Sequence, residues 1–289
     1  MEKRKLKVAA IQTRTMPGAG KEEKMDHLLG LLKKASQAGC RIILPPELYT
    51  SDYEKFYTKD ASLFSGAEPI PGPTTEAVGE VTKKYGNYVI MPLLEKKAPG
   101  IYYNSAATVG PEGKVIANYR KVQVAAMQVL EKLYFRRGNG FDVLRMPESP
   151  QASFGTIICQ DRRFPEIPRI LALMGAEIMF CPVAAAGYVG GGVYWDLVNI
   201  SRSVDNGFFS VYANRVGKEW NKSYFGGSMI VNPWGKVLAS GGRGKDAIVS
   251  AVLDLGEVEK ARISWPMLRD LRNDLYVKYY KSPKYDELL

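Results

Sequence analysis

Ser153-Phe-Gly-Thr-Ile-Ile-Cys159-Gln-Asp-Arg-Arg-Phe-Pro165-Glu166 is the stretch that decides the fold. Its first six residues are small, β-branched or aromatic and predict a buried strand. Pro165 suits a first helical position, and residues 166–174 carry apolar side chains at helical spacing before Gly175 ends the run. The stretch therefore predicts a strand that turns through Cys159 into a helix, as in a layered α/β protein.

Cys159 lies in this tight connection, next to two arginines. A helix N-terminus and nearby guanidinium groups favour thiolate over thiol, so we expect a lowered pKa and a nucleophile usable at neutral pH. A free cysteine is also often a small buried hydrophobic residue. The local sequence leaves both interpretations open.

The same strand and helix pattern occurs twice along the chain. Residues 6–12, 21–38 and 41–45 predict a βαβ unit. The rest of the first half predicts a helix over 74–85, a strand over 88–94, a hairpin over 102–119, weak helical periodicity over 125–134 and a strand over 141–146. After Pro147–Pro150, the second half predicts strands over 153–158, 177–183, 208–214 and 248–253, helices over 165–174 and 193–205, and a hairpin over 228–239. Two similar halves indicate one domain with internal pseudo-symmetry, in which helices cover two stacked sheets.

Composition excludes several classes of protein. The 289 residues carry a formal net charge of +10, but the basic residues are scattered, which favours anionic substrates over nucleic acid. Three cysteines and an opening without an apolar signal region predict a reduced, cytoplasmic protein. No run approaches the roughly 20 apolar residues that span a bilayer, so we expect no membrane association.

The single histidine, His27, falls in the helix predicted over 21–38, where we expect a solvated side chain. One histidine and three scattered cysteines offer no ligand cluster, so we expect no metal or other cofactor. If Cys159 is a nucleophile, its base must be a carboxylate or a lysine.

Two charged residues stand at strand ends. Glu47 follows the strand over 41–45, at the edge where α/β proteins build their sites, although an acid there is often a helix cap or a solvated loop residue. Lys121 closes the second strand of the first hairpin between apolar neighbours. Most lysines are solvated, and burial of this one would require a charge partner or a function.

Glu47 in Leu-Pro-Pro-Glu-Leu, Lys121 in Tyr-Arg-Lys and Cys159 in Cys-Gln-Asp-Arg-Arg-Phe-Pro-Glu resemble, in order and setting, the Glu-Lys-Cys triad of the nitrilase superfamily of carbon–nitrogen hydrolases. The resemblance runs from residue 7 to residue 276. It implies a four-layer αββα sandwich with two mixed sheets, in a single domain over 1–289. It also implies a homodimer or higher homo-oligomer formed through helices near the site, with the 264–289 tail crossing to the partner. Residues 265–289 are basic and tyrosine-rich with little core character, which predicts an extended tail.

Within the superfamily, Leu130-Glu131-Lys-Leu-Tyr-Phe135 and Cys-x-Asp-Arg-Arg-Phe resemble the amidohydrolases that cleave N-carbamoyl amino acids or amines. The resemblance implies that Cys159 attacks the substrate and forms a thioester, with release of ammonia. Glu47 would be the base, Lys121 and the Gln160 backbone N–H would hold the oxyanion, and Glu131 would orient Lys121 or the substrate.

Departures from the family pattern bear on the substrate. Gln123 stands where a histidine is common, and Ala184 and Ala185 begin a loop that is polar in the carbamoylases. Arg162 is expected to bind a substrate carboxylate, whereas Arg163 lies in the frame shared with amidases of small ω-amides. The alternatives are therefore an ω-amide amidase or a non-catalytic relative that serves as a binding module. Glycines 190–192 predict a mobile rim.

Overall fold

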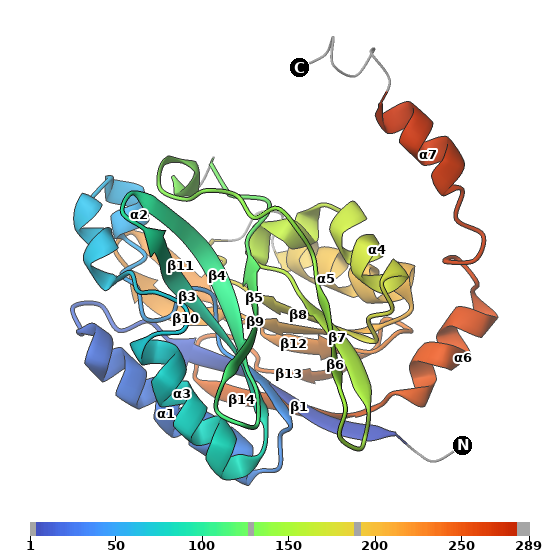
Figure 1. Ribbon diagram of the computed structural model, residues 1–289, viewed down its shortest axis with the longest axis horizontal. Coiled ribbons are helices and arrows are strands. Elements are labelled where there is room, and N and C mark those ends of the chain that lie inside the picture. The colour runs from blue at the N-terminus through green and yellow to red at the C-terminus, as the bar shows by residue number, and fades with distance from the viewer. Residues whose placement is uncertain (1–3, 127–129, 188–191, 282–289) are drawn as a thin grey trace.

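Two β-sheets stack face to face in the computed structural model, which describes residues 4–126, 130–187 and 192–281 (Figure 1). The first sheet has eight strands in the order β11-β10-β1-β2-β3-β4-β5, with β14 paired along β1. Its strands are β1 (Lys5–Arg14), β2 (Ile42–Leu44), β3 (Tyr88–Ala98), β4 (Ile101–Val109), β5 (Val115–Arg120), β10 (Arg215–Glu219), β11 (Lys222–Phe225) and β14 (Ala247–Asp254).

The second sheet has six strands in the order β13-β12-β9-β8-β7-β6. Its strands are β6 (Val143–Met146), β7 (Ala152–Thr156), β8 (Ile178–Pro182), β9 (Phe209–Ala213), β12 (Met229–Val231) and β13 (Val237–Ser240). Glycines 190 and 191, part of the predicted mobile rim, lie outside the described residues.

The two sheets repeat one strand plan. In the first, β1, β2 and β3 run parallel, β4 and β5 follow antiparallel, and β14 flanks β1 antiparallel. In the second, β7, β8 and β9 run parallel, β12 and β13 follow antiparallel, and β6 flanks β7 antiparallel. This correspondence confirms the predicted α/β fold with two stacked mixed sheets and an internal two-fold relation.

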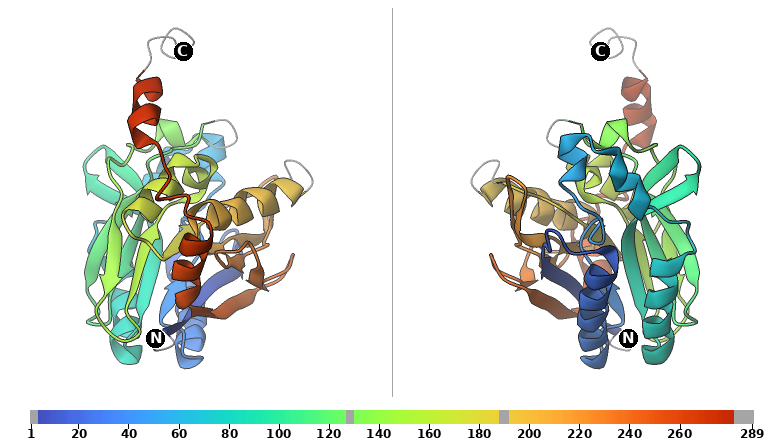
Figure 2. Two further views of the ribbon diagram at one scale, coloured as in Figure 1. Left: turned by 90° about the vertical axis from the view of Figure 1, so that its right-hand side faces the viewer. Right: turned by 90° about the vertical axis from the view of Figure 1, so that its left-hand side faces the viewer.

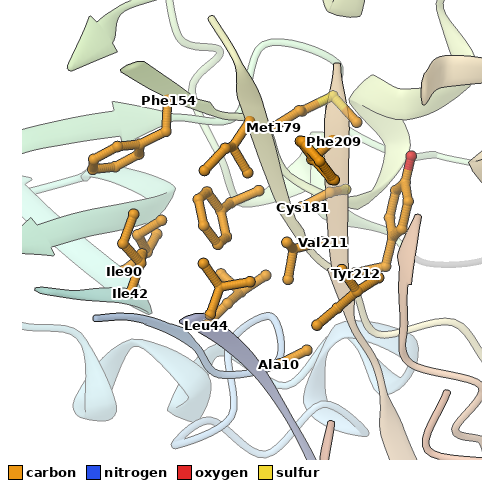
Figure 3. Close-up of a cluster of buried hydrophobic side chains, with 14 of the residues drawn as sticks. Ala10, Ile42, Leu44, Ile90, Phe154, Met179, Cys181, Phe209, Val211 and Tyr212 are labelled. Atoms are coloured by element: carbon orange, nitrogen blue, oxygen red, sulfur yellow. The ribbon is translucent and has the colours of Figure 1, made fainter. Parts of the chain in front are cut away.

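Alternate residues of each strand serve different layers, as the two-residue period of a strand requires. In β1, Val8 and Ala10 pack between the sheets, while Ala9 and Ile11 pack against the helices outside the first sheet. Figure 3 shows side chains of the two sheets meeting, with Leu44 and Ile90 on one side and Phe154 on the other. This apolar layer is the main core.

Helices cover the outer face of each sheet and complete the four layers. They are α1 (Lys21–Gln37) and α3 (Pro73–Tyr85) on the first sheet, and α4 (Glu166–Leu173) and α5 (Val193–Asn206) on the second. Figure 2 shows α1 and α3 side by side. In the described part of the chain, no helix is both long enough and apolar enough to cross a membrane.

The structure corrects several sequence-based predictions. The β10–β11 hairpin was not predicted, because its short strands contain Gly217 and several charged residues that obscure a two-residue period. Short helices α2 (Lys55–Thr58), α6 (Gly256–Ser264) and α7 (Asn273–Tyr280) were also missed, and residues 125–134 form only a 3₁₀ turn, Glu131–Leu133, within their described part.

The C-terminal tail was predicted to be extended, and this is wrong for α7, a helix that projects from the body (Figures 1 and 2). Residues 273–280 contain no glycine or proline that would stop a helix. The packing of this tail on a second copy stays a prediction.

Gly155 in β7 lies against α4, and this contact allows a test of the packing. A Cβ at Gly155 would lie 2.8 Å from both methyl carbons of the buried Leu171. We expect Gly155→Ala to lower the free energy of unfolding by about 1–3 kcal/mol, as overpacking does. Gly30→Ala in α1, where a Cβ meets nothing within 4 Å, is the control and should stabilise by about 0.5–1 kcal/mol. Urea unfolding measures both, and equal effects would contradict the packing argument.

Candidate active site

The three residues of the predicted triad come from loops at the ends of different strands. Glu47 follows β2, and Lys121 directly follows β5, which runs in the same direction as β2 and β3. Cys159 follows β7 of the other sheet and begins the 3₁₀ turn Cys159–Arg163. Lys121 and Cys159 line one cavity of about 730 Å³. Stacking the sheets therefore assembles the site from both halves of the chain.

Lys121 is buried between two carboxylates. Its Nζ lies 2.7 Å from Glu47 Oε1 and 3.0 and 2.8 Å from Glu131 Oε1 and Oε2. Burial lowers the pKa of Lys121, but the two carboxylates outweigh it and raise the pKa well above its usual value. The lysine is therefore a fixed cation beside the cavity. The two carboxylates are the charge partners that burial of Lys121 requires.

Glu47 is fully buried and held from three directions. Asn104 Nδ2 donates to Oε1 at 2.8 Å, and the backbone N–H of Ala184 donates to Oε2 at 2.9 Å. With Lys121 Nζ, these donors come from β4, from the end of β8 and from the end of β5. The carboxylate therefore has one defined orientation.

Glu131 is also fully buried and bonded to neighbours around Lys121. Tyr53 Oη donates to Oε1 at 3.1 Å, and the Ala125 backbone N–H donates to Oε2 at 3.1 Å. Burial raises the pKa of Glu131, the Lys121 ammonium opposes this effect, and the Glu47 carboxylate adds to it. Glu131 thus contacts Lys121 directly, one of the two arrangements expected from the sequence.

Cys159 has a left-handed backbone conformation, with φ of 45°, which is uncommon for a residue with a side chain. Burial and the Glu47 carboxylate outweigh the Lys121 and Arg162 cations and raise the pKa of its thiol to about 11. The expected lowering of this pKa is therefore wrong. A long helix does not begin at Cys159, since α4 starts seven residues later at Glu166. The resting residue is a thiol.

Asp161 joins the cysteine loop to the lysine loop. Its Oδ2 accepts from the Ile158 backbone N–H at 2.9 Å and from Tyr119 Oη at 2.7 Å. Its Oδ1 accepts from the Gln123 backbone N–H at 2.7 Å. The carboxylate thus bridges residues adjacent in sequence to Cys159 and Lys121, and it fixes the two loops relative to each other.

The two arginines after Cys159 both line the cavity but differ in setting. Arg162 is buried and donates from Nη1 to the Cys159 carbonyl at 2.6 Å and from Nε to Asn199 Oδ1 at 3.0 Å. Arg163 is exposed and lies over the Tyr194 ring. Arg162 therefore supports the cysteine turn, and Arg163 stands at the cavity mouth.

The other predicted substrate-binding residues, Gln160, Ala184 and Ala185, also line the cavity. His27 belongs to α1, where its Nε2 lies 3.0 Å from Thr13 Oγ1. Over the described ranges, no three His, Cys, Asp or Glu side chains group as metal ligands.

Several residues of the site were missed in the sequence. Tyr53, Asn104 and Lys222 contribute to the triad or to the cavity wall. Asn104 left a signal, since an asparagine is uncommon within a strand. Tyr53 and Lys222 left none, because they belong to segments with no clear periodicity.

Comparisons with known proteins agree with this geometry. The carbon–nitrogen hydrolase family model matches residues 7–263. The chain therefore belongs to this family, within the nitrilase superfamily that its triad resembles, and it is a hydrolase of carbon–nitrogen bonds other than peptide bonds.

Particular relatives narrow the class. The chain is 33% identical over 261 residues to omega-amidase NIT2 of Bos taurus, covering 89% of this chain and 92% of that protein. It is 31% identical over 271 residues to omega-amidase NIT2 of Homo sapiens, covering 91% and 94%. A carbon–nitrogen hydrolase from Helicobacter pylori G27 superposes with a TM-score of 0.88 at 26% identity, covering 98% of this chain and 100% of that one.

The buried Asp161 gives a pH-dependent test of the loop bridge. Burial raises its pKa to about 6, although the Ile158 and Gln123 N–H groups lower it. An unfolded aspartate titrates near ~3.9. The folded state therefore binds this proton more tightly, and the stability from Asp161 is full below about pH 4 and is lost as the pH rises through 6.

Asp161→Asn does not titrate there. Between about pH 4 and 7, wild type should lose up to about 3 kcal/mol of unfolding free energy relative to the variant. Urea unfolding of both proteins at each pH measures this difference. A constant difference across that range would contradict the assignment.

Proposed function

We propose that this protein is an ω-amidase, which hydrolyses the terminal carboxamide of small compounds through a thioester on Cys159 and releases ammonia. The observation that carries the proposal is the buried Lys121 held between Glu47 and Glu131 beside the Cys159 thiol. An amide hydrolase needs a nucleophile, a group that accepts and returns a proton, and positive charge for the oxyanion. These residues supply all three.

Attack begins with the thiol form of Cys159. As its sulfur bonds to the amide carbon, the S–H proton passes to Glu47, whose orientation is fixed by Asn104 and Ala184. Burial and then the Glu47 carboxylate raise the pKa of the thiol, so a thiolate formed alone is disfavoured. Transfer to Glu47 keeps the charge of the pocket constant, so the base and the nucleophile act together.

The carbonyl oxygen then carries the negative charge of the tetrahedral intermediate. Lys121 and the Gln160 backbone N–H are proposed to stabilise it. Collapse breaks the carbon–nitrogen bond, and Glu47 returns the proton to the departing ammonia. Water next attacks the thioester with Glu47 as base, which releases the carboxylate product and regenerates the thiol.

An ω-amide fits the relatives better than an N-carbamoyl compound. The relatives in Bos taurus and Homo sapiens are omega-amidases and align with about nine-tenths of the chain. The apolar loop Ala184–Ala186 along the cavity agrees, since it lacks the polar side chains expected of carbamoylases. We therefore replace the predicted N-carbamoyl substrate with the alternative, an ω-amide.

Positive charge around the cavity favours a substrate with an anionic far end. The ammonium of Lys121 is offset by Glu47 and Glu131. The remaining cations in the cavity wall are Lys132, Arg162, Arg163 and Lys222. Lys222 lies on the β10–β11 hairpin, and its Nζ is 5.0 Å from the centre of the Tyr57 ring. Both residues line the cavity, so this positive charge belongs to the cavity wall.

Cys159→Ala should abolish ammonia release from a panel of ω-amides, because the proposed thioester forms on this sulfur and, among the described residues, Cys159 is the one cysteine that lines the cavity. Cys181→Ala is the control. Cys181 is buried in β8 within the core, and burial raises the pKa of its thiol well above the usual value, so this variant should keep its turnover. Hydroxylamine should divert the thioester to a hydroxamate, and mass spectrometry of acid-quenched enzyme identifies the acylated residue. Turnover in Cys159→Ala would overturn the mechanism, and release from ureido acids alone would overturn the ω-amide assignment.

Lys222→Gln should raise KM for an ω-amide that carries a distal carboxylate by about 3- to 10-fold, the effect of one partly exposed charge of ~1 kcal/mol. A neutral amide of the same length should be unaffected. Lys218→Gln on the same hairpin is the control and should change neither substrate. Equal losses on charged and neutral amides would mean that Lys222 shapes the wall without binding the carboxylate.

A further inference from the structure

We propose that Arg215 is a positioning residue for Glu47. The guanidinium group of Arg215 fixes the backbone of residues 47 and 48 and so orients the Glu47 carboxylate toward Cys159. This inference rests on the proposed role of Glu47 as the base. Arg215 begins the β10–β11 hairpin and is 168 residues away from Glu47 in the chain. It has no place in the mechanism described above.

The Arg215 side chain donates hydrogen bonds to backbone carbonyls of the loop that follows β2. Its Nε and Nη2 donate to the Glu47 carbonyl at 3.2 and 3.0 Å, and Nη2 also donates to the Leu48 carbonyl. Its Nη1 pairs with Glu219 Oε2 at 3.2 Å. The side chain is 2% exposed. The buried guanidinium of Arg215 thus binds two consecutive carbonyls of the loop that carries Glu47, the proposed base.

The loop needs such a restraint because Leu48 is strained. Its φ is 46°, in the left-handed region that residues with side chains rarely adopt. Such a conformation persists only where its surroundings impose it. The carbonyls on either side of this torsion both accept from Arg215, so the guanidinium opposes relaxation of the loop. Relaxation would turn the Glu47 carboxylate away from its donors.

Arg215 is itself held in place by aromatic rings. Its guanidinium carbon lies 5.9, 5.0 and 5.8 Å from the ring centres of Tyr49, Tyr53 and Tyr224, within cation–π range. Tyr53 also donates to Glu131. The rings therefore hold the guanidinium against the carbonyls of residues 47 and 48.

Lysine cannot replace this arrangement, because a single ammonium lacks the planar fork that reaches two carbonyls and a carboxylate together. We expect Arg215→Lys to lower kcat for an ω-amide by about 10- to 100-fold with KM within about twofold of wild type. Arg262→Lys is the control, since Arg262 is less buried than Arg215 but also donates to a backbone carbonyl, that of Ala176, and does not line the cavity. This variant should keep its kcat.

The rate at which chloroacetamide alkylates Cys159 tests the placement of Glu47 relative to Cys159 without substrate turnover. In this reaction the sulfur–carbon bond forms, chloride leaves, and the thiol proton passes to Glu47. Glu47→Gln and Arg215→Lys should each slow it, and the double variant should be no slower than Glu47→Gln alone, because both act through one carboxylate. Additive losses, or an unchanged alkylation rate in Arg215→Lys, would overturn the inference.

The two hypotheses fail in different ways. If wild type hydrolyses no ω-amide but its alkylation depends on Glu47 and Arg215, the proposed function fails and the positioning role stands. If Arg215→Lys does not fold, Glu219→Gln supplies the test, since it weakens the Nη1 contact and leaves the bonds from Arg215 to the carbonyls of residues 47 and 48 in place, while the glutamine oxygen can still accept from the Glu54 N–H. That variant should lower kcat several-fold at unchanged KM and be non-additive with Glu47→Gln in alkylation. A loss of thermal stability alone would count against the inference.

Discussion

The buried ammonium of Lys121 between two buried carboxylates is the interaction on which the rest of the site depends. Removing three charges from water costs several kcal/mol per ion, and only tight geometry repays it. That geometry requires donors for every carboxylate oxygen, and Asn104, Tyr53 and two backbone N–H groups supply them. The charge cluster therefore dictates the conformation of the loops that meet around it.

The doubled α/β architecture explains how such a cluster can be assembled. Each sheet ends in loops at one edge, and stacking the sheets brings the loop of Cys159 against the loops of Glu47 and Lys121. The apolar layer between the sheets sets their distance, while Asp161 joins the two sets of loops by hydrogen bonds. The apolar packing between the sheets sets the approximate positions of the loops, and hydrogen bonds fix the positions of the individual side chains.

Burial reverses the expectation for the nucleophile and so shapes the chemistry. Nearby cations and a helix end favour a thiolate in water-like surroundings. Within the pocket, desolvation and the Glu47 carboxylate outweigh Lys121 and Arg162, and the pKa of the thiol rises to about 11. In the proposed mechanism, such a thiol passes its proton to Glu47 during the attack. The position of this carboxylate then matters more than the acidity of the thiol, which gives weight to the residues that fix Glu47.

The sequence by itself determined the strand, turn and helix around Cys159, the two-sheet α/β fold, and the candidates Glu47, Lys121 and Glu131, because local periodicity and short motifs carry that information. Only the tertiary structure decided the partners of those side chains. Arg215 is 168 residues from the carbonyl that it holds, and Asn104 is 57 residues from Glu47. It also decided the cavity wall, where the β10–β11 hairpin has no clear period to reveal it. Contacts between distant segments, burial and the resulting pKa values arise when the sheets stack, and no local pattern encodes them.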